Sequence, residues 1–182
     1  TAHLIFMRAR RYPNLSICAV HVHIGSKIMR GEPFVKAFRK VLIFLTSLEQ
    51  EGHRIRYLNL GGGRGIIYSD ERPQTAAEFA KKILPLFRRR RYQLIFEPGR
   101  FIVGNAGIFV TQVLYVKQTK LKNFAIVDGG MNDLIRPALY GSFHDLWPVE
   151  KKGAVRKLTY DAVGPICESG DFLAKNRRIQ EL

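Results

Sequence analysis

The sequence predicts an α/β fold followed by a mostly β region. In roughly the first hundred residues, short apolar runs that favour strands alternate with amphipathic stretches that favour helices. Beyond Gly107 this alternation stops, and strand-like segments follow one another without a long helix between them. Strands that alternate with helices pair in parallel through right-handed crossovers, as in an α/β barrel or a doubly wound sheet.

The individual elements follow from local patterns. Strands are expected where β-branched and aromatic residues cluster, and helices where apolar residues recur with helical spacing. The expected order is strand 16–22, helix 34–48, strand 55–60, helix 76–87 and strand 92–96, then strands 108–117, 123–127 and 158–163. The change of pattern between residues 101 and 107 predicts two domains, residues 1–106 and residues 107–182.

Composition narrows the class of protein. The chain has 182 residues, 46% of them hydrophobic, which is ordinary for a globular protein. No apolar run reaches the roughly 18 residues that cross a bilayer, so we expect no membrane partner. Cys18 and Cys167 lie far apart and form no metal-binding set, which predicts neither a disulfide framework nor a metal site and favours a reducing cytoplasm. The chain begins with Thr1 rather than Met, and we expect a truncated start.

The formal net charge of +15 is the strongest compositional oddity. Its densest part is the run Arg88–Arg91, directly before the expected strand 92–96. Such a run suits a solvated helix end, where positive charges complement the helix dipole. The alternative is a surface that attracts nucleic acid nonspecifically, so no specific nucleic-acid partner is expected.

Each of the first three expected strands ends in a polar or glycine-rich loop. In parallel α/β folds the carboxyl ends of the strands form the edge where ligands bind. The loops are 21–26, with two histidines, 61–65, with four glycines, and 97–100, which reads Glu-Pro-Gly-Arg. The glycines are suited to cradle a phosphate, although a tight turn explains them equally well. Their spacing fits neither the P-loop nor the dinucleotide fingerprint.

Two side chains in these loops suggest a flat, protonated ring as ligand. His23 places an imidazole at the same edge as Ser26, and a heteroaromatic ring can stack on it; the alternative is a purely structural histidine. Glu97 ends an apolar strand and needs a cation or an N–H donor. Arg100 is one candidate, and the protonated nitrogen of pyridoxal phosphate is the other. His21 shares the strand face, but no third ligand completes a metal site.

A second candidate site lies near the C-terminus. The segment 163–171 reads Val-Gly-Pro-Ile-Cys-Glu-Ser-Gly-Asp and places the thiol of Cys167 beside the carboxylate of Glu168. A thiol and a carboxylate side by side in a glycine-rich loop are suited to proton transfer. An ordinary turn with a buried cysteine is the alternative.

Taken together, these motifs resemble those of the diaminopimelate decarboxylases, a family in the alanine-racemase-like, fold-type III class of pyridoxal-phosphate enzymes. The resemblance runs from about residue 17 to 175, and its five motifs occur in family order: His23-Ile24-Gly25-Ser26, Leu60-Gly61-Gly62-Gly63, Glu97-Pro98-Gly99-Arg100, the segment from Asp128 to Tyr140, and Gly164 to Asp171. It implies the C-terminal part of a (β/α)8 TIM barrel, about three βα units, followed by part of a mostly β domain.

The resemblance also implies roles for single residues. His23 would stack on the cofactor ring and Glu97 would pair with its nitrogen, while the phosphate would be held by Ser26, Gly63 and the Pro98-Gly99-Arg100 turn. The substrate-binding residues would be Arg100, Arg136, Tyr140 and Glu168. Cys167 would be the proton donor to the substrate carbon after CO2 departs.

The implied reaction is decarboxylation of meso-2,6-diaminopimelate to L-lysine and CO2, the last step of lysine biosynthesis. The resemblance further implies a homodimer, with Cys167 and Glu168 contributed by the neighbouring subunit. The family's Schiff-base lysine and a late tyrosine fall outside these residues, so we expect an internal fragment that is inactive and prone to aggregate by itself. Lys27 stands where the family commonly has glutamine, and Arg64 is unusual after the glycines.

Three alternatives remain open from the sequence. A sister decarboxylase would act on ornithine, arginine or carboxynorspermidine; the segment 136–140 and the Glu168 loop favour diaminopimelate because its far end carries both a carboxylate and an ammonium. A non-catalytic relative would have lost the lysine. A nucleic-acid-binding module would use the basic surface and would bind in a salt-sensitive way.

Overall fold

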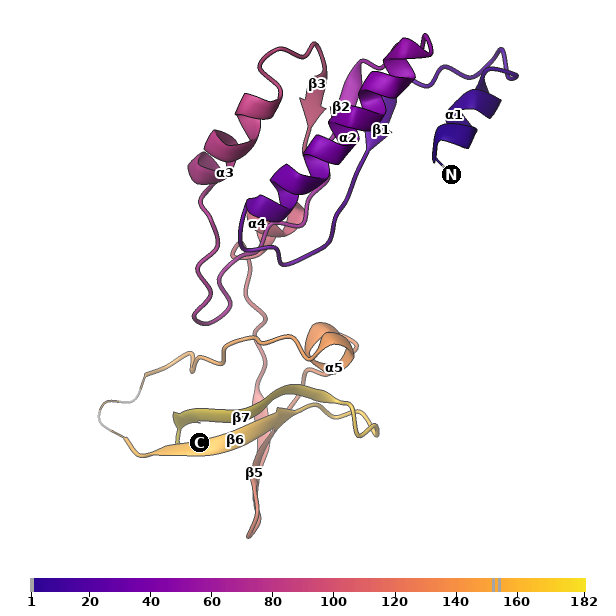
Figure 1. Ribbon diagram of the computed structural model, residues 1–182. Helices are drawn as coiled ribbons and strands as arrows, with labels where there is room; N and C mark the ends of the chain where they lie inside the picture. The colour runs from indigo at the N-terminus through magenta and orange to yellow at the C-terminus, as the bar shows by residue number, and fades with distance from the viewer. Residues whose placement is uncertain (1, 152, 154) are drawn as a thin grey trace. The chain divides into compact units, whose positions relative to one another are not determined.

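The computed structural model describes residues 2–151, 153 and 155–182, and these form two compact units. Unit 1 comprises the described residues up to 67 together with 71–107, and unit 2 comprises residues 68–70 and the described part of 108–182. Figure 1 shows strands with covering helices in unit 1 and a mostly β arrangement in unit 2. The α/β class predicted from the sequence is confirmed.

Unit 1 is built on three short parallel strands in the order β1-β2-β3, which are Ala19–His21, Tyr57–Asn59 and Gln93–Ile95. Each lies within its expected range but is shorter, although the ladder of hydrogen bonds continues past the strand ends. Val22 N donates to Asn59 O at 2.9 Å, and Leu60 N donates to Ile95 O at 2.9 Å. The register aligns His21 with Asn59 and Asn59 with Ile95. The three carboxyl ends therefore lie side by side at one edge.

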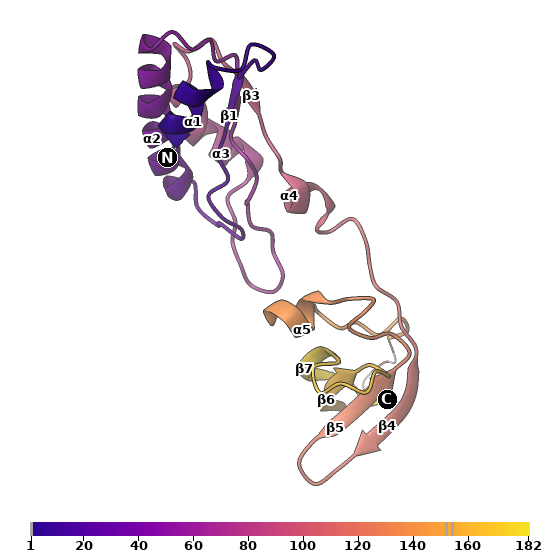
Figure 2. The same ribbon diagram turned by 90° about the vertical axis from the view of Figure 1, so that its right-hand side faces the viewer.

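The helix α2, Glu32–Gln50, supplies most of the core of unit 1. Its buried side chains recur every three or four residues and are Phe34, Phe38, Leu42, Leu45 and Leu48. They pack with Leu58 of β2 and with Phe79 of the second covering helix, α3. Figures 1 and 2 show α2 and α3 on the same side of the three strands, which leaves the strand ends free to carry loops.

Helix α3, Ala76–Ile83, has clear start and stop signals. Thr75 caps it, because its hydroxyl accepts a hydrogen bond from Glu78 N while the Glu78 carboxylate accepts one from Thr75 N. These bonds hold the pKa of the Glu78 carboxyl below its ordinary value. The helix ends before Pro85, which has no N–H to continue it, and residues Leu84–Leu86 form a 3-10 turn. The helix is therefore shorter than the expected 76–87.

Two helices of unit 1 were not predicted. Helix α1, Ala2–Ala9, packs by a single buried residue, Phe6, whose ring contacts Phe44 of α2 edge-on at 5.8 Å between centroids. Helix α4, Gly99–Val103, has only five residues and begins with glycine. The residues of α1 are apolar almost throughout and α4 is little more than one turn long, so neither segment shows apolar residues at helical spacing.

Unit 2 is a four-stranded sheet in the order β4-β5-β6-β7, which are Val113–Gln118, Asn123–Val127, Lys157–Val163 and Phe172–Gln180. The outer pairs are antiparallel, and β5 and β6 are parallel. Residues 108–112 lie outside β4, contrary to the expected strand 108–117. Strand β7 was not predicted, because its charged residues interrupt the alternation of apolar and polar residues. A short helix, α5, spans Arg136–Tyr140.

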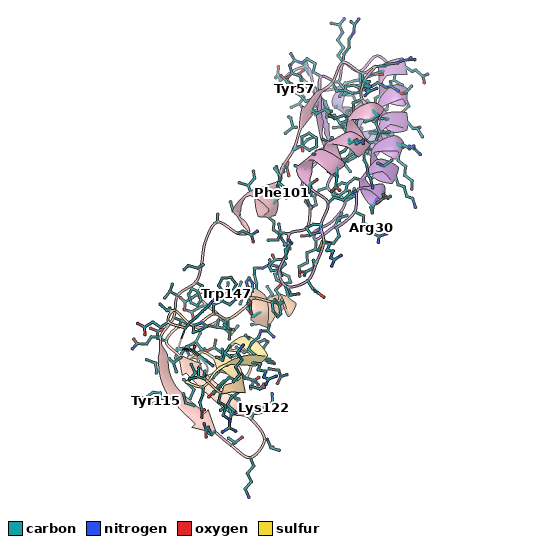
Figure 3. The ribbon with its side chains drawn as sticks, turned by 90° about the vertical axis from the view of Figure 1, so that its left-hand side faces the viewer. Arg30, Tyr57, Phe101, Tyr115, Lys122 and Trp147 are labelled. Atoms are coloured by element: carbon teal, nitrogen blue, oxygen red, sulfur yellow. The ribbon has the colours of Figure 1, made fainter. Side chains whose placement is uncertain are left out.

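The core of unit 2 is small and its first strand is exposed. Four buried residues, Val127, Ala162, Leu173 and Ala174, form its cluster. Every residue of β4 is exposed, and Figure 3 shows Tyr115, a residue that is 70% exposed, on this strand. Within the described part of the chain, no helix combines the length and apolar character needed to cross a membrane.

Candidate functional site

The predicted ligand residues of unit 1 gather at the carboxyl ends of its three strands. His23 follows β1, Gly61 to Gly63 follow β2, and Glu97 follows β3. The parallel register holds these loops side by side, and Glu97 N donates to Gly61 O at 2.9 Å. The sequence-based expectation that the loops share one edge is therefore met by the strand order and by direct hydrogen bonds.

The glycine loop contacts both neighbouring loops backbone to backbone. A Cβ at Gly62 would lie 2.1 Å from Glu97 O, and a Cβ at Gly63 would lie 2.0 Å from Gly25 O. Gly63 also has a φ of +94°, which side chains disfavour. Its carbonyl accepts a hydrogen bond from Ile28 N at 2.9 Å. The glycines are thus required for close packing of the loops, in addition to any role in binding an anion.

His23 is exposed and held in one tautomer. Its Nδ1 accepts a hydrogen bond from Gly62 N at 3.3 Å, so the proton of the neutral ring lies on Nε2. The contact fixes the ring beside the glycine loop. An exposed, oriented imidazole at this edge is suited to stack against a flat ligand.

Glu97 is oriented by a residue that the sequence analysis missed. Asn59 Nδ2 donates to Glu97 Oε1 at 2.7 Å, while Asn59 Oδ1 accepts a hydrogen bond from Gly61 N at 2.9 Å. His21 Nε2 lies 3.5 Å from the same carboxylate oxygen. Among the described residues, Glu97 Oε2 has no hydrogen-bond partner, and the Glu97 side chain is 49% exposed. The carboxylate is therefore fixed through one oxygen and presents the other.

Arg100 does not pair with Glu97 among the ion pairs of the described residues, so the internal partner considered from the sequence is not found. Arg100 Nη1 is buried and has no hydrogen-bond partner in the described part of the chain. A buried guanidinium N–H without an acceptor is costly, and an anion would satisfy it. Ser26 is exposed near the same edge, and a Cβ at Gly99 would meet nothing within 4 Å.

Arg64 lies between two aromatic rings. Its guanidinium carbon is 4.8 Å from the centroid of Phe79 and 3.9 Å from that of Phe101, a residue of α4 labelled in Figure 3. Arg64 Nη2 also donates to Gln74 O at 2.7 Å. Burial lowers the pKa of this guanidinium below its ordinary value. The unusual arginine therefore tethers α4 to the glycine loop through stacking.

In unit 2, α5 carries the predicted substrate residues Arg136 and Tyr140. The Arg136 guanidinium lies 5.7 Å from the Tyr140 ring centroid, and its Nη2 donates to Ser142 Oγ at 3.1 Å. The residue Tyr140 is 66% exposed. The helix ends at Gly141, whose φ of +58° is the left-handed conformation that glycine favours. The five-residue helix thus presents a cation and a phenol together.

The loop 164–171 presents the thiol and the carboxylate predicted from the sequence. Cys167 is exposed and not in a disulfide. Glu168 is exposed, and its Oε1 accepts a hydrogen bond from Gly170 N at 3.0 Å. Glu168 N donates to Ile166 O at 2.8 Å, which bends the loop so that it closes on itself. A thiol proton source and an anion for an ammonium group therefore share one turn.

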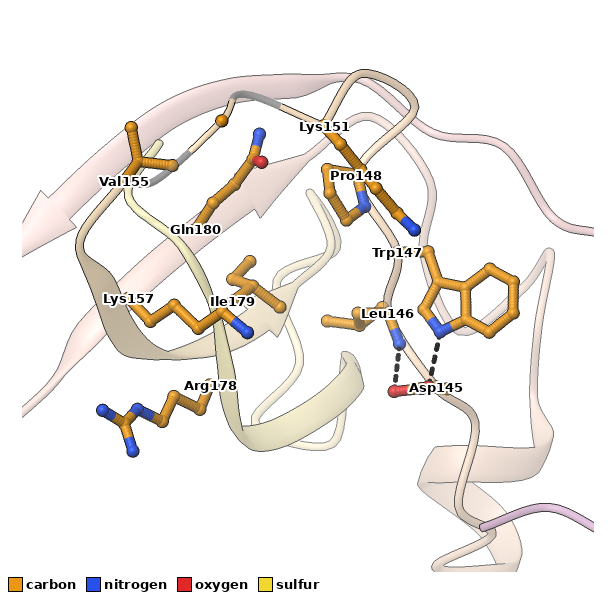
Figure 4. A pocket seen from close by; sticks show the side chains of 11 residues that line it. Asp145, Leu146, Trp147, Pro148, Lys151, Val155, Lys157, Arg178, Ile179 and Gln180 are labelled. Atoms are coloured by element: carbon orange, nitrogen blue, oxygen red, sulfur yellow. Dashed lines mark hydrogen bonds between the residues drawn. The ribbon is translucent and has the colours of Figure 1, made fainter.

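A surface cavity of about 570 Å³ also lies in unit 2, but it contains none of the predicted site residues. Figure 4 shows its walls, which include Trp147, Lys157 and Arg178. Its acid, Asp145, accepts hydrogen bonds from Trp147 Nε1 and Leu146 N. In the described part of the chain, no group of three metal-ligating side chains is found. The chemistry-bearing residues therefore lie on the loops rather than in this cavity.

The candidate residues form two groups, one in each unit, which we name half-site 1 and half-site 2. Half-site 1 in unit 1 contains the loops of His23, Gly63 and Glu97; half-site 2 in unit 2 contains α5 and the Cys167 loop. The contacts that order half-site 1 involve Asn59, which lies outside the five motifs. Asn59 could be suspected only from its place at the end of a strand, directly before the glycine loop.

Comparison with known proteins identifies the family of this chain. Residues 17–182 match the family described as pyridoxal-dependent decarboxylase, C-terminal sheet domain. A diaminopimelate decarboxylase of Vibrio cholerae is 47% identical over 174 residues, which cover 95% of this chain and 42% of that protein. One of Aquifex aeolicus is 47% identical over 178 residues, covering 96% of this chain and 41% of that protein. The chain therefore spans less than half the length of these relatives.

Solved structures give the same result. The crystal structure of diaminopimelate decarboxylase from Helicobacter pylori complexed with L-lysine matches with a TM-score of 0.90 and 37% identity, covering 100% of this chain and 45% of that one. A protein of known structure from Aquifex aeolicus matches with a TM-score of 0.95 and 44% identity, covering 100% of this chain and 45% of that one. The chain belongs to the pyridoxal-dependent decarboxylase family.

Proposed function

We propose that these residues form part of a diaminopimelate decarboxylase, and we call the full-length protein that would carry them the parent protein. It would remove the α-carboxylate at the D-centre of meso-2,6-diaminopimelate, giving L-lysine and CO2. The observation that carries the proposal is the oriented carboxylate of Glu97, whose Oε1 is held by Asn59 at 2.7 Å while Oε2 has no partner among the described residues. The identities of 45–47% to several diaminopimelate decarboxylases support the choice of substrate.

The residues of half-site 1 fit pyridoxal phosphate as cofactor. Glu97 would accept a hydrogen bond from the protonated ring nitrogen through Oε2, and His23 would cover one face of the ring. The partnerless buried N–H of Arg100 supports a nearby phosphate, with Ser26, Gly63 and the Pro98-Gly99 turn as further phosphate contacts. When bound, the cofactor supplies the electron sink that makes loss of the carboxylate possible.

The protein's own residues would then orient the substrate and move a proton. Arg136, Tyr140 and Arg100 would bind substrate carboxylate groups, since a guanidinium offers a fork of donors. Glu168 would bind the distal ammonium. The Cys167 thiol would donate its proton to the substrate carbon that has lost CO2. Its exposure and the absence of a disulfide at Cys167 support this role.

The parent protein would be a homodimer in which half-site 2 of one subunit completes half-site 1 of its partner. Mixing two inactive variants tests this. If Cys167→Ala and Glu97→Ala subunits are unfolded and refolded together in equal amounts, half of the dimers are mixed and each has one intact site, so about a quarter of the wild-type activity returns. No recovery in verified mixed dimers would contradict a shared site.

We also place the parent protein in the cytoplasm, where Cys167 stays reduced.

The function itself is tested by assaying the purified parent protein with pyridoxal phosphate. We expect L-lysine and CO2 in equal amounts from meso-diaminopimelate. We expect at least tenfold lower kcat/KM for ornithine, arginine and carboxynorspermidine, because only diaminopimelate carries at its far end both a carboxylate, which binds a protein cation, and an ammonium, which binds a protein anion. A preference for any of the other three would reassign the substrate. Cofactor binding without turnover of any of the four would indicate a non-catalytic relative.

A further inference from the structure

The buried carboxylate of Asp171 connects the two loops that carry half-site 2. The Asp171 residue is 4% exposed. Its Oδ1 accepts a hydrogen bond from Met131 N at 2.6 Å, and its Oδ2 accepts one from Ile166 N at 2.7 Å. Met131 lies in the segment that leads into α5, and Ile166 directly precedes Cys167. One side chain therefore holds the backbones of both loops.

The surroundings of Asp171 are shaped to admit this carboxylate. A Cβ at Gly164 would lie 2.4 Å from Asp171 Oδ2, and a Cβ at Gly130 would lie 3.1 Å from Oδ1. The Asp171 backbone closes the same turn, because its N donates to Glu168 O at 2.9 Å and its O accepts from Gly164 N at 3.2 Å. Two glycines, one in each loop, thus leave room for the oxygens that join the loops.

Among the described ion pairs, Asp171 has no cationic partner. Burial of a carboxylate that is compensated only by N–H groups is costly, and an apolar residue would close a simple turn at lower cost. A buried carboxylate of this kind contributes through its directional hydrogen bonds, which fix two backbone segments relative to each other. Those backbones carry the proposed proton donor and the proposed substrate residues.

We propose that Asp171 is a positioning residue, which sets Cys167 and Glu168 against Arg136 and Tyr140 without touching the substrate. This inference rests on the proposed function. If the carboxylate is lost, the Cys167 thiol no longer has a fixed direction, and a misplacement of about 1 Å can lower turnover by up to about a hundredfold. Cofactor binding, which depends on half-site 1, should not change.

The test uses the parent protein and the substitution Asp171→Asn, which keeps the shape but turns one acceptor into a donor that faces an N–H. We expect kcat to fall at least about tenfold, with pyridoxal-phosphate affinity within about twofold of wild type. Turnover in D2O should lose the single configuration of deuterium at the carbon that lost CO2, because water then replaces the thiol as donor. The rate of Cys167 alkylation by iodoacetamide should change at least about threefold.

Two further variants complete the test: one replaces Asp171→Asn if that protein fails to fold, and the other is a control. Gly130→Ala leaves the carboxylate in place but crowds it, and we expect the same changes in smaller size. Asp145→Asn is the matched control, since Asp145 also accepts two N–H bonds in unit 2 but in a loop without site residues. It should behave as wild type in all four measurements.

The outcomes separate the two hypotheses. Wild-type alkylation rate and deuterium configuration in Asp171→Asn, or in Gly130→Ala where the first variant does not fold, would overturn the positioning role. If the wild-type parent protein forms no lysine, the proposed function fails, but the alkylation rates still report whether Asp171 orients Cys167. A changed alkylation rate in an inactive parent protein would therefore support the positioning role alone.

Discussion

The substitution Asn59→Leu tests how much the side-chain amide of Asn59 contributes to the stability of unit 1 and to the order of half-site 1. Leucine keeps a similar size but removes both hydrogen bonds of the side chain, to Gly61 N at 2.9 Å and to Glu97 Oε1 at 2.7 Å. Gly61 is buried, so its N–H loses its acceptor where water has little access, at a cost of about 1 to 3 kcal/mol. The bond to the half-exposed Glu97 adds no more than about 1 kcal/mol after screening. We therefore expect unit 1 to lose about 1 to 4 kcal/mol of stability.

The assay uses the half-buried thiol of Cys18, which reports on the opening of unit 1. Pulse alkylation across a urea series in the parent protein, read peptide by peptide by mass spectrometry, gives the unfolding free energy of the surroundings of Cys18. The same variant should bind pyridoxal phosphate about tenfold more weakly, because Glu97 is no longer oriented; tenfold corresponds to about 1.4 kcal/mol.

The control is Asn123→Leu, which removes a single amide bond, to Thr159 O at 3.1 Å, in unit 2. It should leave both the Cys18 labelling midpoint and the cofactor affinity unchanged. If Asn59→Leu and Asn123→Leu give the same Cys18 labelling midpoint and the same cofactor affinity, the prediction is refuted. The amide of Asn59 would then contribute no more than the amide of Asn123.

Three further predictions concern stability of the parent protein. Phe38→Ala empties a fully buried position of α2 and should cost about 3 to 5 kcal/mol in urea unfolding, against less than about 0.5 kcal/mol for Ile43→Ala, which is 73% exposed; equal costs would contradict the assigned core. Thr75→Ala removes the α3 cap and should cost about 1 kcal/mol, with faster amide exchange in the first turn as the check. Burial opposes ionisation of Asp161, but hydrogen bonds from Lys122 and Asn176 N outweigh it and lower its pKa. Its stabilising contribution is therefore present at neutral pH and lost as pH falls below about 4, and Lys122→Met should reduce this acid sensitivity in a pH series of melts.

Much of unit 1 could be predicted because its signals are local. Apolar residues of α2 recur with helical spacing from Phe34 to Leu48, and each loop motif directly follows a strand. The positions at which helices and strands end could be predicted less well. Pro85 stops α3 earlier than the apolar pattern suggests, and β7 contains the polar run Lys175 to Arg178, which conceals a strand that pairs with β6 along its length.

The contacts that order the candidate site could not be predicted, because they join residues far apart in the chain. Asn59 and Glu97 are separated by 38 positions, and Met131 and Asp171 by 40. Nothing in the composition of either segment indicates its partner. Sequence reasoning identified the residues proposed to do chemistry, whereas the roles of Asn59 and Asp171 in holding the loops became visible only with the fold.

The backbone contacts of the glycine loop limit how this protein can change over evolution. At Gly62 and Gly63 the nearest neighbours are carbonyl groups of other loops, which cannot rotate away as a side chain can. These positions therefore favour glycine alone, and the proposed cofactor end of the site has little room to vary. Arg136 and Tyr140 lie on the short helix α5, half-buried and exposed respectively, and Glu168 lies in an exposed turn, so these positions already accommodate long side chains. Under the proposed function, new substrate preferences should therefore arise mainly by substitution in half-site 2, while the glycines of half-site 1 stay constant.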